Sequence, residues 1–425
     1  MDRVLQRRAA PYILLAVLVA ASIGVRCFRL EQPCDHGCRN HAAASLIFDE
    51  AYYVNAARRI AGVPAAKDQP SYGKAPSGTD PNAEHPQLGK LVMAAGIEIF
   101  GNRPLGYRIG SVLAGTAVLL LMFALVRAAG GGPWLALGAT AVLAADHLFT
   151  VHGRIATLDI YYLAFMLGGV ALYLRRRPVL AGVVLGVGAT TKLVGIYALF
   201  ILGLLELGRW ATRRRGEIEP LALCIVATGI AYAVVLQVLD MSFPAFDPGT
   251  GEQFHNFIAH TRHMLDYAAQ LTSPGGPKGI ASYPWSWLAG QGTIPYLTVN
   301  STTSAGGQVV STTTLVAFRG AVNPFLLYLA TPALFAAAAR AWSDGDDLDI
   351  LALAWFLGTM VPFSLQAIFQ DRTTYLYYLV ATLPAICLAC ARLFSIRGVP
   401  RAAALGWGVA LIVGFVNLYP FRTLF

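Results

Sequence analysis

The sequence predicts an all-α polytopic membrane protein, with about eleven transmembrane helices and two interfacial helices in its first outer loop. Of its 425 residues, 56% are hydrophobic and only 13% are charged, and the mean hydropathy is +0.56. A soluble protein of this length could not bury so much apolar surface, so lipid must solvate most of the chain. The net charge of +9 could indicate a nucleic-acid partner. We expect none, because the basic residues form short clusters between apolar runs.

The apolar runs set the predicted spans. The first, at 10–25, has a basic flank like that of a signal peptide, but no small-residue cleavage site follows it before Arg26, so we expect an uncleaved anchor. The other runs lie at 107–127, 133–150, 157–174, 179–192, 194–210, 220–239, 323–341, 350–369, 374–393 and 402–421. The runs at 179–192 and 194–210 are short and meet at Lys192, so they can also form one broken pair.

The loops between these runs divide by charge. With a cytoplasmic N-terminus, the loops that face the cytoplasm carry the arginine clusters, as the positive-inside rule requires: Arg127, Arg175 to Arg177, Arg213 to Arg215, Arg392, Arg397 and Arg401. We therefore predict a multi-pass protein of the cell membrane, with a single transmembrane domain over residues 1–425. A first outer loop at 27–106, a second outer region at 240–322 and a turn at 370–373 would share the outer face.

Short elements are predicted within both outer regions. A helix opens at Asp49, with Tyr53, Ala57 and Ile60 on one apolar stripe, and 88–100 is a second interfacial helix too short to span. Residues 68–81, rich in proline, glycine and serine, are expected to be a flexible connector. In the second region, 255–270 has a helical pattern, 282–287 is an interfacial aromatic cluster and 309–318 alternates like a strand.

Two adjacent carboxylates, Asp49 and Glu50, begin the first interfacial helix, and Glu84 and His85 follow in the same loop. Asp49 can be a helix N-cap and Glu50 an acid favoured by the helix dipole. The alternative is chemistry at the membrane edge. Further polar residues lie at the outer ends of the spans and favour this second interpretation: Arg108, Asp146, His147, His152, Arg154, Asp159, Lys192 and Arg372.

Carboxylates beside fixed cations suit transfer of a sugar from a lipid phosphate. The anionic leaving group needs arginine or lysine, and the acceptor hydroxyl needs a carboxylate as general base. One such carboxylate near the anomeric carbon favours direct displacement with inversion. The lipid tail would then lie between spans, with the sugar on the outer side.

The chain resembles the GT-C membrane glycosyltransferases. It is most similar to the dolichyl- or polyprenyl-phosphate-mannose protein mannosyltransferases, with the aminoarabinose transferases as cousins. The similar segments span most of the sequence: Phe48-Asp49-Glu50-Ala51-Tyr52-Tyr53-Val54, Glu84-His85-Pro86-Gln87-Leu88-Gly89-Lys90, Tyr107-Arg108-Ile109-Gly110-Ser111, Arg154-Ile155-Ala156-Thr157-Leu158-Asp159, Thr191-Lys192, His263-Met264-Leu265-Asp266-Tyr267, Ser282-Tyr283-Pro284-Trp285-Ser286-Trp287, and Arg372 with Tyr375, Tyr377, Tyr378 and Pro384.

This resemblance implies roles for the candidate site residues. Asp49 would activate the acceptor, with Glu50 in support and Glu84 as a third catalytic carboxylate. The expected substrate-binding residues are His85 in the same cavity, Arg108 holding the loop or the substrate, Lys192 and Arg372 facing the lipid phosphate, and Arg154, Asp159 and Tyr375. Gln87 departs from the family, which usually has a second proline there. Residues 68–81 are an unusual insertion, so the sugar and the acceptor are less defined than the reaction.

The resemblance therefore implies transfer of a sugar, first of all mannose, from a polyprenyl-phosphate donor to a hydroxyl. The expected acceptor is Ser or Thr of a secreted protein, on the periplasmic, extracellular or lumenal face. One alternative is a GT-C transferase that modifies a lipid or polysaccharide with another sugar. Another, from a different class, is a transporter or lipid flippase, which would place charges near span centres.

Cofactors and cysteines stay open at this stage. No cofactor is certain, although a divalent metal is possible, and His255, His260 and His263 at helical spacing could form a metal face. Cys34 and Cys38 can form a disulfide, stay free, or make a metal knuckle with His36 and His41.

Overall fold

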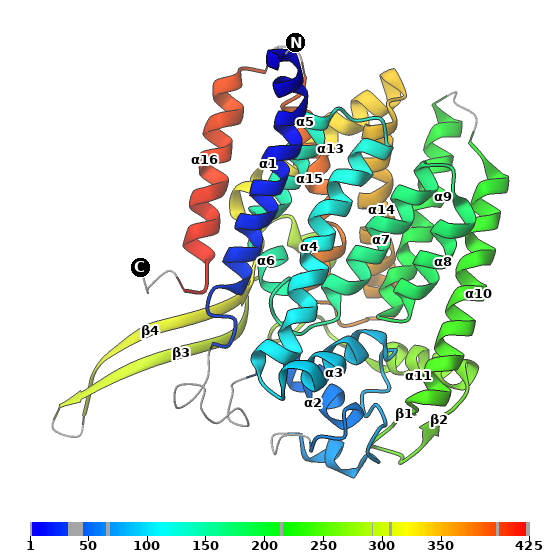
Figure 1. The fold of residues 1–425 in the computed structure, drawn as a ribbon, viewed down its shortest axis with the longest axis vertical. Coiled ribbons are helices and arrows are strands. Elements are labelled where there is room, and N and C mark those ends of the chain that lie inside the picture. Colours follow the sequence, from blue (N-terminus) through cyan, green and yellow to red (C-terminus); the bar gives the residue numbers. More distant parts are fainter. Residues whose placement is uncertain are drawn as a thin grey trace.

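The computed structural model describes residues 2–32, 46–64, 69–212, 216–290, 292–305, 308–396 and 399–421. The predictions for Cys34 and Cys38 with their neighbouring histidines, for the arginines at 213–215 and for Arg397 lie outside these residues. Helices dominate the described chain, as predicted, and Figure 1 shows them as an elongated bundle with smaller elements at one end.

Eleven helices make up the bundle. They are α1 (Asp2–Cys27), α4 (Pro104–Ala128), α5 (Pro133–Ala144), α7 (Asp159–Leu174), α8 (Pro178–Ala189), α9 (Tyr197–Ala211), α10 (Ile218–Ser242), α13 (Pro324–Asp344), α14 (Asp347–Phe369), α15 (Leu383–Leu393) and α16 (Arg401–Leu418) among the described residues. By length and composition, seven helical segments of the described chain could cross a membrane, and α5, α7, α8 and α15 are apolar but shorter. A multi-pass membrane protein is therefore confirmed, while the count of eleven spans stays a prediction.

Two of the predicted spans are interrupted, and two others meet, near the same end of the bundle. The run at 133–150 divides into α5 and α6 (His147–His152), and the run at 374–393 into η5 (Leu376–Ala381) and α15. The runs that meet at Lys192 form α8 and α9, with η4 (Leu193–Ile196) between them, and whether they are two spans or one broken pair stays a prediction. Asp146 explains the first break, because its carboxylate accepts the backbone N–H groups of Phe149 and Asn323, both at 2.9 Å. Irregular backbone at membrane depth needs such buried partners.

The small elements lie at the end of the bundle opposite the start of α1 (Figure 1). They are α2 (Glu50–Ile60), η3 (Pro70–Lys74), α3 (Leu88–Phe100), β1 (Ala245–Phe246), β2 (Gln253–Phe254), α11 (Phe257–Gln270) and α12 (Pro284–Trp287). The predicted helices at 88–100 and 255–270 are confirmed. The prediction of a flexible connector is wrong for its described part. Residues 69–81 include η3, and within them Tyr72 and Asp80 are buried.

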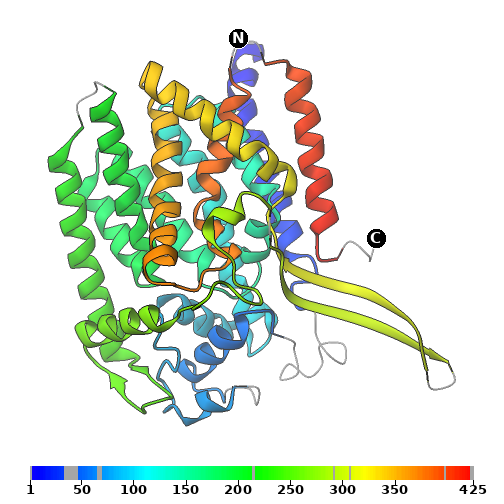
Figure 2. The ribbon, with the colours of Figure 1, turned by 180° about the vertical axis from the view of Figure 1, so that it is seen from behind.

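A long antiparallel hairpin, β3 (Ile294–Ala305) and β4 (Gln308–Gly320), projects away from the bundle (Figure 2). The predicted strand at 309–318 is confirmed, whereas its partner was not predicted. At the base of the hairpin, the Phe318 ring meets the Phe421 ring edge-on at 5.6 Å between centroids.

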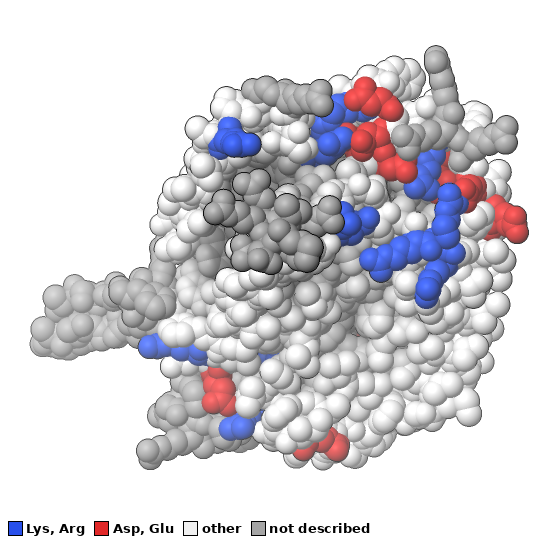
Figure 3. All heavy atoms as spheres, turned by 45° about the horizontal axis from the view of Figure 1, so that its top comes forward, with Lys and Arg blue, Asp and Glu red and all other residues white. Residues whose placement is uncertain are grey.

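The end of the bundle at which α1 begins carries a mixture of basic and acidic side chains (Figure 3). Several of these join helices through ion pairs, such as Arg209 with Asp347 at 3.3 Å, Arg392 with Asp346 at 2.8 Å and Arg340 with Asp349 at 2.6 Å. These contacts hold α9, α13, α14 and α15 together at one end of the bundle. The predicted site residues lie toward the opposite end.

Candidate active site

Asp49 occupies the residue before α2, yet its side chain makes no capping hydrogen bond. The N-cap interpretation of this carboxylate is therefore wrong. Instead, the carboxyl group accepts a hydrogen bond from Tyr377 and faces the charges of Lys192 and Asp159. Burial raises the pKa of Asp49 to about 7, and Asp159 adds to the rise, whereas Lys192 and Tyr377 oppose it. A carboxylate with this pKa can accept a proton near neutral pH.

The backbone just before Asp49 is strained. Phe48 has a positive φ of 56°, a left-handed conformation that bulky residues rarely adopt. Its ring stacks on Tyr296 with the centroids 4.1 Å apart and meets the Tyr377 ring edge-on at 5.3 Å. Packing against β3 and η5 thus holds the strained turn, and such strain concentrates at functional sites.

Glu50 and Arg108 form a fully buried ion pair. The Arg108 Nε donates to Glu50 Oε1 at 2.8 Å and its Nη2 to Oε2 at 2.7 Å, and both side chains are 0% exposed. The backbone N–H groups of Ile47 and Ala156 donate to the same carboxylate, each at 2.8 Å. Arg108 also donates to the carbonyls of Leu30 and Gln32. The pair therefore ties the start of α2 to α4 and to the turn before α7.

Lys192 and Asp159 form a second buried pair next to Asp49. The Lys192 Nζ donates to Asp159 Oδ1 at 2.9 Å, and the other carboxylate oxygen lies 3.4 Å from His152 Nδ1. The His152 Nε2 lies 2.9 Å from the Tyr296 hydroxyl. The rings of Tyr377 and Tyr378 stand within 5.5 Å of the Lys192 ammonium group. This cation is hydrogen-bonded to Asp159, faces the Asp49 carboxyl and lies against an aromatic wall. A fixed positive charge next to Asp49 can attract an anion.

The segment with Glu84 and His85 faces the same region through Tyr53. The His85 and Tyr53 rings lie 5.9 Å apart, and after desolvation the charges of Asp49 and Glu84 contribute to raising the pKa of Tyr53. The Asn82 amide donates to Glu84 Oε2 at 2.6 Å. Burial raises the pKa of Glu84, and burial followed by the Lys192 charge lowers that of His85.

Arg372 and Tyr375 border this region in the segment before η5. The Arg372 guanidinium donates to the Ala268 carbonyl of α11, and its charge acts on His85. The Tyr375 ring stacks on Tyr377 with 5.7 Å between centroids. Both residues therefore lie around the site that the sequence predicted, and the Arg372 side chain donates to backbone there.

Arg154 is directed to the base of the hairpin. Its guanidinium carbon lies 5.4 Å from the centre of the Phe318 ring and 4.8 Å from that of Phe421, and its Nη2 donates to the Arg29 carbonyl at 3.0 Å. These contacts fix β4 and the end of the chain against the bundle. The predicted substrate contact of Arg154 stays a prediction.

Sequence reasoning missed several residues around Asp49. Tyr377 and Tyr378 entered only as part of a motif, His152 only as one of many polar residues, and Phe48 and Tyr296 were given no role. The predicted metal face does not form around His260, which bonds to Asp240 and to a carbonyl. Among the described residues, no group of three or more His, Cys, Asp and Glu side chains could hold a metal ion.

Among the apolar grooves of the described bundle, two differ in their relation to the candidate site. The larger, of about 970 Å³, lies between α1, α5, α15 and α16 and is lined by none of the candidate site residues. The smaller, of about 660 Å³, lies between α3, α4, α7 and α8, and Leu88 and Thr191 line one end of it. Thr191 directly precedes Lys192, so this smaller groove reaches the chain segment that carries the candidate phosphate-binding cation.

The fold is that of the GT-C membrane glycosyltransferases, as predicted. The Saccharomyces cerevisiae protein O-mannosyltransferase Pmt1-Pmt2 complex bound to the sugar donor has a TM-score of 0.70, at 12% identity over 99% of this chain and 92% of that chain. ArnT from Cupriavidus metallidurans bound to undecaprenyl phosphate has a TM-score of 0.56, at 17% identity over 95% of this chain and 63% of that chain.

The predicted resemblance to the protein mannosyltransferases is also confirmed. A family model for dolichyl-phosphate-mannose-protein mannosyltransferase matches residues 99–243. The polyprenol-phosphate-mannose–protein mannosyltransferase of Mycolicibacterium smegmatis is 22% identical over 98% of this chain and 90% of its own length. That of Corynebacterium glutamicum is 23% identical over 89% of this chain and 83% of its own length.

Proposed function

We propose that this protein is a glycosyltransferase that moves a sugar from a polyprenyl-phosphate donor to an acceptor hydroxyl with inversion. Mannose is the first candidate for the sugar and a protein for the acceptor, because similar proteins are named polyprenol-phosphate-mannose–protein mannosyltransferases. Within that acceptor class, we propose Ser or Thr of a secreted protein, as the family resemblance implies. The observation that carries the proposal is the Asp49 carboxyl, whose pKa is raised to about 7 and which faces the Lys192 charge.

In this reaction Asp49 is the general base. The phosphate is already a good leaving group, whereas the acceptor hydroxyl attacks only if its proton has an acceptor. Asp49 takes that proton while the acceptor oxygen bonds to the anomeric carbon and the bond from that carbon to the phosphate oxygen breaks. Glu84 and His85 line the acceptor side of the cavity, and Glu50 supports the site through Arg108.

Lys192 and Arg372 bind the phosphate that leaves. Fixed cations in a poorly solvated site stabilise an anion more than they would in water. Asp159 holds the Lys192 ammonium group at 2.9 Å, and the tyrosine rings exclude water from it. The groove beside Thr191 would take the isoprenoid chain of the donor, since its lining is apolar along α4, α7 and α8.

The test is transfer of radiolabelled sugar by the purified protein. Membranes that contain polyprenyl-phosphate [³H]mannose supply the donor, with a Ser- and Thr-containing secreted protein as the acceptor. The proposal expects label in the protein acceptor with the wild-type chain and none above background with Asp49→Asn. Label confined to lipid or polysaccharide would favour the alternative acceptor, and no label in any fraction would contradict the proposed reaction.

We also propose that the N-terminus is cytoplasmic and that the site opens on the outer face. The positive-inside pattern supports this orientation, and eleven spans would then place the C-terminus outside. A peptide tag added after Phe425 should react with a membrane-impermeant reagent in intact cells. A tag that reacts only after lysis would contradict the eleven-span topology.

A further inference from the structure

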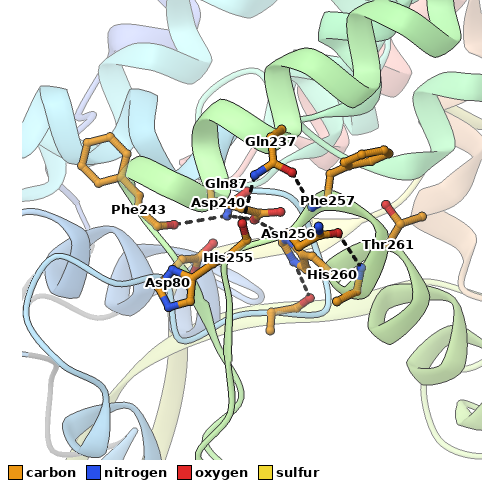
Figure 4. Close-up of polar contacts among 12 residues, drawn as sticks. Asp80, Gln87, Gln237, Asp240, Phe243, His255, Asn256, Phe257, His260 and Thr261 are labelled. Carbon is orange, nitrogen blue, oxygen red and sulfur yellow. Dashed lines mark hydrogen bonds and ion pairs between the residues drawn. The ribbon is translucent and has the colours of Figure 1, made fainter.

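A buried polar cluster joins the first outer loop to α10 and α11, apart from the residues around Asp49 (Figure 4). It contains Asp240 in the last turn of α10, His260 in α11 and Gln87 just before α3, and all three are 0% exposed. The Asp240 Oδ1 lies 2.7 Å from both His260 Nδ1 and Gln87 Nε2. The His260 Nε2 lies 3.0 Å from the Ala83 carbonyl.

The hydrogen bonds of this cluster require a shared proton. The Ala83 carbonyl can only accept, so the His260 Nε2 donates to it. If Asp240 is ionised, its Oδ1 also only accepts, and His260 donates from both nitrogens as an imidazolium. If Asp240 instead carries the proton, it donates to Nδ1. In both forms one proton lies between Asp240 Oδ1 and His260 Nδ1 and the pair has no net charge, which is a favourable way to bury two ionisable groups.

The cluster holds both ends of the segment that carries Glu84 and His85. His260 bonds to the carbonyl of Ala83, the residue before Glu84, and Asp240 accepts from the Gln87 side chain two residues after His85. Gln87 Nε2 also donates to the Phe243 carbonyl at 3.2 Å. The position at which the sequence departs from the family therefore supplies the link between this segment and α10.

Lys90 supports the same segment from the other side. Its Nζ donates to the carbonyls of Asn82 at 2.6 Å and His85 at 2.8 Å and pairs with Asp80 at 2.5 Å. Other ionisable groups that interact with the cluster include Asp80, His263 on α11 and Tyr232 on α10. Carbonyls at 82, 83 and 85 are thus all held by buried donors, which leaves the Glu84 and His85 side chains few positions to adopt.

We propose that Asp240, His260 and Gln87 form a latch that positions Glu84 and His85 for the transfer reaction. These three are positioning residues, because their contacts reach the site only through the backbone of residues 83–87. This inference rests on the proposed function, because Glu84 and His85 need fixed positions only if they take part in the transfer reaction. The latch also makes α11 part of the active-site support, in addition to its contact with Arg372.

Hydrogen exchange of the full-length purified protein tests the latch without any substrate. The backbone N–H groups of Asn82, His85 and Leu88 are hydrogen-bonded, so they report the order of the segment. His260→Phe keeps a ring stacked on Phe254 but loses the hydrogen bonds to Asp240 and to the Ala83 carbonyl. We expect peptides covering residues 80–90 to exchange roughly 10- to 100-fold faster, with α4 and α14 unchanged.

His263→Phe is the matched control, because His263 lies one turn away on α11 and also contacts the Phe254 ring. It should leave the exchange of residues 80–90 at the wild-type rate. Gln87→Ala is the milder variant, which keeps the Asp240–His260 pair and should accelerate exchange of the segment roughly 3- to 10-fold. If His260→Phe destabilises the whole chain, the Gln87→Ala variant provides the test. Exchange of residues 80–90 at the wild-type rate in Gln87→Ala would contradict the latch.

Transfer kinetics test whether the latch serves the reaction. In Gln87→Ala and His260→Phe we expect kcat to fall roughly tenfold while the donor KM stays within about twofold, since the segment does not bind the phosphate. Faster exchange with an unchanged kcat would overturn the positioning role. If the wild-type protein shows no transfer activity, the proposed function is contradicted. The hydrogen-exchange result then still shows whether the latch orders residues 80–90.

Discussion

Asp49 and Glu50 are adjacent in the sequence, yet the structure gives them opposite environments. Glu50 accepts four hydrogen bonds, two from Arg108 and two from backbone N–H groups, and it is completely buried. Asp49 accepts one side-chain hydrogen bond, from Tyr377, and faces another carboxylate, Asp159. This difference indicates that the two adjacent carboxylates have different roles, one structural and one catalytic.

A carboxylate whose oxygens are all occupied by fixed donors has no free position for a substrate proton, and its removal breaks the structure around it. A carboxylate with few partners and a raised pKa is available for proton transfer. We therefore interpret the Glu50–Arg108 pair as the anchor of the loop and Asp49 as the reacting group. Each prediction below breaks or sharpens this contrast.

The largest expected effect is on the anchor. Arg108→Ala leaves the Glu50 carboxylate buried without its main partner, which costs about 3–5 kcal/mol of folding free energy. The melting temperature in detergent should fall sharply. Asp49→Asn is the matched comparison and should keep or raise the melting temperature above neutral pH, because the ionised form of Asp49 is disfavoured by burial. Equal melting temperatures for Arg108→Ala and wild type would show that the pair is no anchor.

The second effect is on the donor phosphate. Lys192→Ala and Arg372→Ala should each weaken donor binding roughly 10- to 100-fold, because the phosphate loses a fixed cation in a poorly solvated site. Arg372→Lys should restore only part of the affinity, since the planar, two-pronged geometry is lost. Arg103→Ala, which removes a partly exposed cation directly before α4, is the control. Unchanged donor affinity in both alanine variants would assign these cations to structural roles.

The third effect is a pH dependence. Burial raises the pKa of Asp49 to about 7, so the base is protonated and inactive below that pH and free above it. The value of kcat/KM should therefore rise with pH and level off above about pH 7, in a series from about pH 5 to about pH 9. A profile that is already level at pH 5 would mean that the reacting base has an ordinary carboxyl pKa.

The sequence predicted the helical runs well because each helix in lipid must satisfy its own backbone and expose apolar side chains. It did not predict where the runs at 133–150 and 374–393 break. Those breaks depend on tertiary partners, such as the backbone of Asn323 that bonds to Asp146, and no local pattern identifies them. The connector at 68–81 was misinterpreted for a similar reason, since its polar Asp80 is buried only because Lys90 pairs with it.

The candidate site was predicted in part. Charge and family resemblance selected Asp49, Lys192 and Arg372, and the structure places Lys192 close to Asp49. The resemblance assigned Asp49 and Glu50 different roles, and the structure adds the different partners of the two carboxylates. Tyr377 and Tyr296 come from distant segments and contact the site through aromatic packing, which leaves no signal in a single sequence.

The most direct measurement is single-turnover transfer from polyprenyl-phosphate mannose to a Ser- or Thr-containing acceptor by Asp49→Asn and Glu50→Gln, each normalised to folded protein. The account predicts that Asp49→Asn binds donor almost as the wild type does and loses roughly 100-fold or more of the rate. Among molecules that stay folded, Glu50→Gln should reduce the transfer rate much less than Asp49→Asn does. Near-normal transfer by Asp49→Asn, together with loss of transfer by folded Glu50→Gln or by Glu84→Gln, would contradict the assignment of Asp49 as the base.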